Sequence, residues 1–225
     1  MRYKRVTLLS GHYGSGKTNI AVNFAMDLRK QYEKVAIADL DIVNPYYRSV
    51  DSREMLEENG IRIICSEFAN TNVDFPALPQ EIYSIVDDRE TKVIIDVGGD
   101  ERGALALGRI ADAIREENDF DMFLVVNRFR PLTPDVDSTV EVMLEIEDTC
   151  KLSFTGIIND SNLGPETTAE IILNSRQYGL DLSQKTGLPL CGTAVEEKFI
   201  KELEGKIPDL IPMRLQRRPI DEEEL

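Results

Sequence analysis

Long apolar runs are missing from this 225-residue sequence, which has no stretch of about 18 or more uncharged apolar residues. Its first residues, Met-Arg-Tyr-Lys-Arg, lead directly into a short strand-like run instead of a signal-peptide core. Cysteine is also scarce: Cys65, Cys150 and Cys191 lie far apart and form no Cys-x-x-Cys pair, which argues against a disulfide framework, an iron–sulfur site or a zinc site. We therefore expect an intracellular, cytoplasmic protein with reduced core thiols that neither spans a membrane nor is secreted.

Basic side chains are in the minority, with 26 Lys and Arg against 41 Asp and Glu, so the formal net charge is −15. This charge opposes the counterion release that drives non-specific nucleic-acid binding, and a polynucleotide is not the expected partner. The one concentrated basic stretch, around Arg214, Arg217 and Arg218, is followed at once by four acidic residues. We interpret a tail over about 213–225 as a solvated chain end, with a partner-docking segment as the alternative.

The alternation of secondary structure predicts the fold class. Short β-branched runs alternate with longer amphipathic segments, which is typical of a doubly wound α/β domain with a mostly parallel sheet of about seven strands. We expect one such domain over residues 1–225, with strands at 6–10, 35–39, 61–65, 93–97, 122–127, 154–159 and 190–193. Helices are expected near 16–31, 51–59, 78–89, 103–117, 135–149, 165–186 and 195–204.

A glycine-rich motif lies between the first strand and the first helix. Residues 11–18 read Gly-His-Tyr-Gly-Ser-Gly-Lys-Thr, the pattern of a phosphate-binding P-loop in the strand-to-helix context that it requires. Its glycines let backbone N–H groups approach phosphate oxygens, and the helix directs its positive dipole end at the same anion. Lys17 is expected to neutralise the β and γ phosphates and the Thr18 hydroxyl to bind Mg²⁺. The expected nucleotide-binding residues of this segment are Gly11, Gly14, Ser15, Gly16, Lys17, Thr18 and Asn19.

Together with this loop, an acidic pair after the second strand makes the sequence resemble a known family. Asp39-Leu40-Asp41 matches the Asp-x-Asp of MinD/ParA-like P-loop ATPases, the CobQ/CobB/MinD/ParA nucleotide-binding domain of the SIMIBI class. The resemblance covers most of the chain and implies a P-loop NTPase fold that binds ATP and Mg²⁺. It implies that Asp41 lies in the first switch and orients the attacking water, so that Lys17 and Asp41 are the expected catalytic residues. It also implies that Asp39 holds the magnesium shell; the alternative is a pair of solvated acids at a loop start.

The run Val93-Ile94-Ile95-Asp96-Val97-Gly98-Gly99-Asp100 resembles the Walker B strand and second switch of the same family. Asp96 is expected to bind magnesium through water at the end of a buried strand. Gly98 or Gly99 is expected to offer a backbone N–H to the γ-phosphate, because a residue without a side chain allows that approach.

A third strand end bears on the choice of base. Residues 154–159 match the family strand that ends in an Asn facing the purine, here Asn159, whose amide can both donate to and accept from adenine. GTPases typically show Asn-Lys-x-Asp at this place, whereas this chain has Asn-Asp-Ser-Asn and lacks both the Lys and the final Asp. The sequence therefore favours ATP over GTP, while a turn-forming Asn is the alternative interpretation of Asn159.

The sequence departs from its relatives at the position of their signature lysine, which is occupied here by the single histidine, His12. A protonated His12 could contact phosphate, or the ring could point away from it. Arg48 and Arg102 are the other candidates for a charge-stabilising side chain in the switches. A basic amphipathic C-terminal helix for membrane recruitment is not expected, since two prolines interrupt residues 207–212.

Three functions remain open at this point. The first is a slow ATPase that acts as a nucleotide-dependent switch on an unidentified protein partner, with an ATP-dependent homodimer as one form of it. The second is an ATP-dependent small-molecule kinase or ligase resembling CobB and dethiobiotin synthetase, with its acceptor on the loop over 65–80. The third is a nucleotide-binding scaffold that does not hydrolyse.

Overall fold

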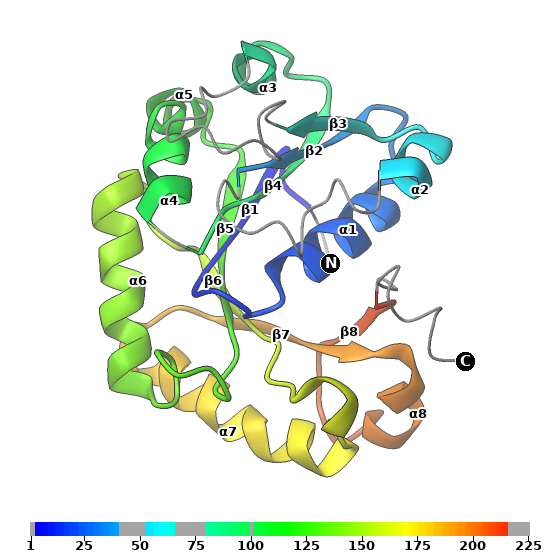
Figure 1. Cartoon of the computed structure of the whole chain (residues 1–225), viewed down its shortest axis with the longest axis vertical. Helices are drawn as coiled ribbons and strands as arrows, with labels where there is room; N and C mark the ends of the chain where they lie inside the picture. Colours follow the sequence, from blue (N-terminus) through cyan, green and yellow to red (C-terminus); the bar gives the residue numbers. More distant parts are fainter. Residues whose placement is uncertain (1–2, 41–52, 66–79, 100, 216–225) are drawn as a thin grey trace, which may run out of the picture.

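The computed structural model describes residues 3–40, 53–65, 80–99 and 101–215. The strands within these ranges form one eight-stranded sheet in the order β3-β2-β4-β1-β5-β6-β7-β8, and each neighbouring pair is parallel (Figure 1). They are β1 (Val6–Ser10), β2 (Val35–Asp39), β3 (Arg62–Cys65), β4 (Lys92–Asp96), β5 (Phe120–Val126), β6 (Gly156–Asn159), β7 (Leu190–Glu196) and β8 (Leu210–Met213). The predicted doubly wound, mostly parallel α/β fold is confirmed.

Helices cover both faces of this sheet, with α1 and α2 on one face and α4, α5, α6 and α7 on the other (Figure 1). They are α1 (Lys17–Arg29), α2 (Arg53–Glu58), α3 (Ser84–Asp87), α4 (Glu101–Gly108), α5 (Ala111–Glu117), α6 (Val136–Cys150), α7 (Ala169–Thr186) and α8 (Ile200–Leu203). Short 3₁₀ turns precede three of them, η2 (Gln80–Tyr83), η3 (Gly164–Glu166) and η4 (Glu197–Phe199). No helix in the described ranges is both long enough and apolar enough to cross a membrane.

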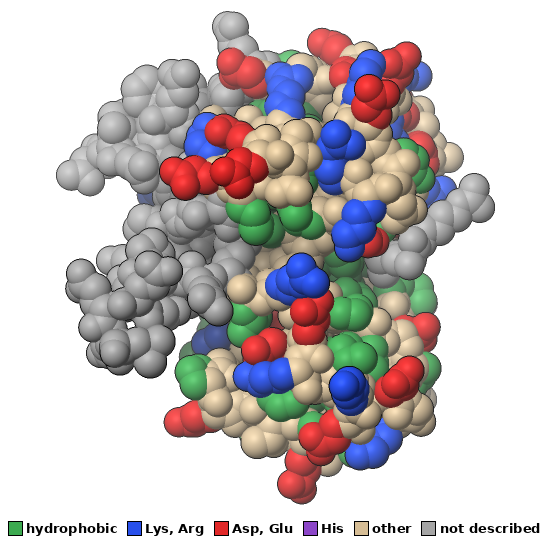
Figure 2. Space-filling view, turned by 90° about the vertical axis from the view of Figure 1, so that its right-hand side faces the viewer, with side chains coloured by type: hydrophobic (Ala, Val, Ile, Leu, Met, Phe, Trp, Pro, Cys, Tyr) green, Lys and Arg blue, Asp and Glu red, His purple; other side chains and the backbone are tan. Residues whose placement is uncertain are grey.

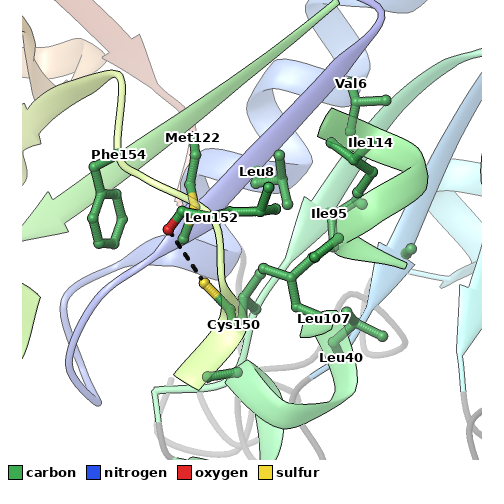
Figure 3. Close-up of a cluster of buried hydrophobic side chains, with 14 of the residues drawn as sticks. Val6, Leu8, Leu40, Ile95, Leu107, Ile114, Met122, Cys150, Leu152 and Phe154 are labelled. Atoms are coloured by element: carbon green, nitrogen blue, oxygen red, sulfur yellow. Dashed lines mark hydrogen bonds between the residues drawn. The ribbon is translucent and has the colours of Figure 1, made fainter. Parts of the chain in front are cut away.

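The core lies in two layers because the central strands are buried on both faces, as expected for a covered parallel sheet. In the larger layer, Leu8 of β1 and Ile95 of β4 contact side chains of the α4–α6 layer such as Leu107 (Figure 3). Cys150 ends α6 in the same layer, where its thiol donates to the carbonyl of Leu152 at 3.6 Å. The other layer contains Ile20, Phe24 and Leu28, which recur at four-residue steps along α1 and are fully or almost fully buried.

The predicted sheet lacked its last strand. The sequence predicts only a segment broken by prolines over residues 207–212 and a solvated tail from about 213, but Leu210–Met213 forms β8 beside β7 and Met213 is buried. Pro212 is tolerated because an edge strand has one side without ladder partners. Arg214, just after β8, exchanges hydrogen bonds with Asn23 of α1, so the described chain remains docked beyond the strand.

Two helix predictions also need correction. The single helix expected over 103–117 is two helices, α4 ending at Gly108 and α5 beginning at Ala111, because the backbone leaves the helical region at Ile110, the N-cap of α5, with φ −114° and ψ 1°. The helix expected over 195–204 begins only after β7, which continues to Glu196.

Charges are mixed on the face of the molecule seen in Figure 2, where Lys and Arg side chains are interspersed with Asp and Glu. The net negative charge is therefore not gathered into a single field on that face.

Chain order places a topological switch point at β1. The strand order reverses at β1, which has β4 on one side and β5 on the other. In open parallel sheets, ligands bind outside the carboxyl ends of the strands at such a switch point. The glycine-rich loop leaves β1 at this position, and the strands that end in Asp39, Asp96 and Asn159 end on the same side of the sheet.

Candidate functional site

The glycine-rich loop connects β1 to α1 and takes a path that side chains would block. Gly11, Gly14 and Gly16 have φ angles of 146°, 73° and 91°, in the region that strongly favours glycine. A side chain on Gly11 would also meet the Val125 carbonyl oxygen at 2.3 Å. The loop therefore depends on its glycines both for its curvature and for its close packing on β5.

The start of α1 is suited to an anion. Its N-cap, Gly16, offers no side-chain cap, and the first turn contains no acidic residue. Helix N-termini bind anions through their first N–H groups and the positive end of the helix dipole. Lys17 is only 6% exposed, and its ammonium donates to the His12 carbonyl at 3.1 Å, so it lies across the loop. This donor set suits a nucleotide phosphate.

Three predicted metal-site residues meet at the carboxyl ends of β2 and β4. The Thr18 hydroxyl donates to Asp96 Oδ2 at 2.6 Å. Asp39 and Asp96 are register partners on adjacent strands, with exposures of 6% and 1%. Among the described residues no group of three His, Cys, Asp or Glu side chains could hold a metal alone. The set fits Mg²⁺ bound together with phosphate oxygens and water, which is how this ion is usually held at phosphate sites.

The segment after β4 packs against the glycine-rich loop. A side chain on Gly99 would meet the Tyr13 backbone nitrogen at 2.5 Å, and one on Gly103 would meet the Gly98 nitrogen at 2.6 Å. The structure thus brings Gly99 to the loop and packs Gly98 against Gly103 of α4. Their N–H contacts with a γ-phosphate stay a prediction.

Asn159 has a different environment from the one that we expected. Its side chain is fully buried, with Nδ2 donating to Ser175 Oγ at 3.0 Å and Oδ1 accepting from Ser161 Oγ at 2.6 Å. These bonds fix the turn after β6 against α7, in line with the turn-forming alternative. Base recognition by Asn159 stays a prediction, and it would require that these bonds be exchanged.

The structure adds Asp160, which sequence reasoning had not selected. Its Oδ2 lies 1.7 Å from the point where a Gly16 side chain would begin, so the carboxyl group touches the loop. Desolvation by burial raises the pKa of this carboxyl from 3.8 to about 8, while hydrogen bonding from Asn162 and the charge of Arg130 act in the opposite direction. The only signal in the sequence was that an acid occupies the Lys position of the GTPase motif.

This contact predicts a pH-dependent stability difference. Because the pKa of Asp160 is raised in the folded state, folding retains a proton that the unfolded chain loses, and stability falls as pH rises from about 4 to about 8. Asp160→Asn does not lose stability in this way. The difference in melting temperature, variant minus wild type, should therefore be several degrees larger at pH 8 than at pH 4.5. Thermal melts at both pH values measure the difference, and a constant offset would disprove the effect.

The other predicted site residues lie at the edge of this arrangement or outside the described residues. Asn19 lies in the first turn of α1, where its carbonyl accepts from Asn23. His12 is partly exposed, its Nδ1 is 3.1 Å from the Tyr13 carbonyl oxygen, and desolvation lowers its pKa. Arg102 is exposed on α4. Asp41, Arg48 and most of the loop expected over 65–80 lie outside the described residues.

A glycine-rich loop between β1 and α1 of a parallel sheet, with a lysine across it and a threonine bonded to a strand-end aspartate, defines a P-loop nucleotide-binding domain. A family model described as the CobQ/CobB/MinD/ParA nucleotide binding domain matches residues 6–169. The chain belongs to this family, which confirms the resemblance stated from the sequence. No curated protein matches the chain at a significant level.

Solved structures of similar fold include FtsY proteins. FtsY of Thermotoga maritima is 16% identical with a TM-score of 0.56, covering 84% of this chain and 61% of that one. FtsY of Mycoplasma mycoides is 17% identical with a TM-score of 0.55, covering 86% and 60%. The signal recognition particle receptor FtsY of Elizabethkingia anophelis, in complex with GDP, is 16% identical with a TM-score of 0.53, covering 87% and 58%. The chain thus spans about three fifths of these proteins, and at such identities the likeness shows the fold alone.

Proposed function

We propose that this chain is a Mg²⁺-dependent ATPase that acts as a nucleotide-dependent switch on a protein partner. The observation that carries the proposal is the 2.6 Å hydrogen bond from Thr18 to Asp96, because it joins the phosphate loop to the strand-end acid beside which a metal would lie. Such positioning of phosphate, metal and acid provides most of what phosphoryl transfer needs from a protein.

Each element of the site has a separable task in this proposal. The loop N–H groups and Lys17 hold the phosphates, and Thr18, Asp39 and Asp96 hold the metal and its waters. Bound magnesium supplies charge neutralisation at the phosphate oxygens. Gly99 lies against the loop and Gly98 against Gly103 of α4, so that this segment connects the position of the γ-phosphate to α4.

ATP is proposed as the nucleotide because of the loop after β6. Asn162 occupies the place of the carboxylate that accepts guanine protons in GTPases. Its Nδ2 donates to the Asp160 carbonyl at 2.9 Å and its Oδ1 accepts from the Gly164 N–H at 3.1 Å. A neutral amide that is occupied in this way is a poor acceptor for two guanine N–H groups.

Phosphate release tests the proposed function. Purified protein is incubated with Mg-ATP or Mg-GTP, first alone and then with a panel of small-molecule acceptors. Slow release from ATP without an acceptor supports the switch. Phosphate release that requires an acceptor would instead support a small-molecule kinase or ligase. Nucleotide binding without phosphate release would support a scaffold that does not hydrolyse.

The proposed role of Asp41 gives a more specific expectation. If Asp41 orients the attacking water, Asp41→Ala should keep ATP affinity near that of wild type and lose hydrolysis by about 100-fold or more, because its contact matters in the transition state. Binding and phosphate release are measured on the same preparation, with Asp39→Ala for comparison. A loss of ATP affinity as complete as that of Lys17→Ala would make Asp41 a binding residue instead.

The trapped variant also tests the homodimer. Size-exclusion chromatography of Asp41→Ala with Mg-ATP should show a larger species if the ATP-bound form dimerises, and a monomer under these conditions would remove the dimer from the proposal.

A further inference from the structure

The glycine-rich loop has one ammonium group, that of Lys17, and a histidine whose charge is disfavoured. Desolvation and the positive charges of Lys17 and Arg130 all lower the pKa of His12, so its ring is neutral near pH 7. A nucleoside triphosphate brings several negative charges into this loop. A second side-chain cation, beside Lys17 and the magnesium of the proposed function, would come from outside this loop.

Arg130 lies in the required position. It belongs to the loop between β5 and α6, and its Nε donates to the Gly14 carbonyl at 2.7 Å. A side chain on Gly14 would meet Nε at 3.0 Å and Cζ at 3.2 Å, so the guanidinium packs directly on the phosphate loop. This hydrogen bond uses one of the five N–H donors of the arginine and leaves the fork formed by its two Nη groups.

The turn that carries Arg130 is held by buried hydrogen bonds. The Arg130 N–H donates to the Asn127 carbonyl, and the Arg130 carbonyl accepts from the Thr133 N–H, both at 3.1 Å. The fully buried Asn127 accepts from Phe129, and Thr133 Oγ1 donates to the Asn127 carbonyl at 2.9 Å. Tyr178 of α7 donates to the Thr133 carbonyl at 3.2 Å. Such a network fixes the backbone from which the guanidinium extends, as preorganised binding sites require.

Arg128, two residues earlier in the same loop, does not contact the glycine-rich loop as Arg130 does. Its guanidinium lies 5.9 Å from the ring centroids of both Phe129 and Tyr178, packed on aromatic side chains instead of on the glycine-rich loop. Two arginines of one loop therefore have different environments, and Arg130 is the one that contacts the nucleotide-binding segment.

We propose that Arg130 is a phosphate-binding residue, supplied by the β5–α6 loop of the same chain, that acts as the second cation of the site beside Lys17. The inference rests on the proposed function, since it assumes that a nucleotide binds at the glycine-rich loop. Bidentate N–H groups and a permanent charge suit the guanidinium to a phosphate group whose charge grows during transfer.

The test compares Arg130→Gln with Arg130→Lys, using Arg128→Gln as the matched control. Gln retains a donor for the Gly14 carbonyl but removes the charge, whereas Lys keeps both. For Arg130→Gln we expect ATP affinity to fall about 10- to 100-fold and kcat to fall about 100-fold. Arg130→Lys should recover part of each loss, and Arg128→Gln should match wild type.

Ionic strength separates a phosphate contact from a structural brace. The ATP affinity of wild type should weaken more steeply with added KCl than that of Arg130→Gln, because the variant has lost one screened charge contact. Equal affinity in wild type and Arg130→Gln, or equal salt dependence, would overturn the inference. Lys17→Ala is measured in the same series. If Lys17→Ala binds and hydrolyses ATP normally, the proposed function fails. If Lys17→Ala is inactive but Arg130→Gln binds and hydrolyses ATP like wild type, only this inference is refuted.

Discussion

Lys17→Ala is expected to lose ATP hydrolysis by about 100-fold or more and to bind ATP at least about 10-fold more weakly. The ammonium lies across the phosphate loop, where it donates to the His12 carbonyl and is almost completely buried. A charged donor held in that position needs no rearrangement when charge develops on the transferred phosphoryl group. Its removal therefore affects both the bound state and the transition state.

Lys30→Ala is the control for this experiment. Lys30 follows the same helix, but its side chain is exposed and pairs with the part-exposed Asp27 at 3.5 Å. Phosphate release and calorimetric titration of both variants give kcat and affinity. Hydrolysis at the wild-type rate in Lys17→Ala would place the reaction elsewhere in the chain.

Asp96→Asn is expected to require about 10- to 100-fold more Mg²⁺ for half-maximal activity and to turn over more slowly at saturating metal. The substitution keeps the size of the side chain and an acceptor for the Thr18 hydroxyl, but it removes the negative charge that attracts the ion and its waters. The folded structure should survive because the amide can occupy the same space at the end of β4.

Asp121→Asn provides the matched comparison for Asp96. Unlike the fully buried Asp96, this acid is only partly buried, and it lies near the beginning of β5, therefore at the opposite edge of the parallel sheet. Magnesium titrations of ATPase activity should leave Asp121→Asn unchanged. An unaltered magnesium requirement in Asp96→Asn would contradict the proposed metal site.

Features of the site that are local in sequence could be predicted. The glycine-rich loop, the helix that follows it and the strand ending in Asp96 each carry their signal within a few residues, and a parallel sheet places all such strand ends at one edge. The Thr18–Asp96 hydrogen bond confirms that these two motifs meet.

The missed features depend on contacts between distant segments. Arg130 of the β5–α6 loop reaches Gly14 across 116 positions of sequence, so this contact has no local signature. Asp160, directly after β6, lies against Gly16, and the acid at the Lys position of the GTPase motif did not by itself predict that contact. Asn159 was predicted from its position after a strand. Its bond to Ser161 belongs to the local turn, whereas its bond to Ser175 arises only from the packing of α7. Strand β8 was missed because it is short and contains Pro212, which only an edge position can accommodate.

A calorimetric titration of the purified wild-type chain with ATP, in the presence and absence of Mg²⁺ and alongside GTP, tests the central claim most directly. We expect ATP to bind at one site per chain. This binding should be tighter with Mg²⁺ than without it, tighter for ATP than for GTP, and strongly weakened in Lys17→Ala. Absence of ATP binding, or ATP binding that is unchanged in Lys17→Ala, would contradict the assignment of this loop as the nucleotide site.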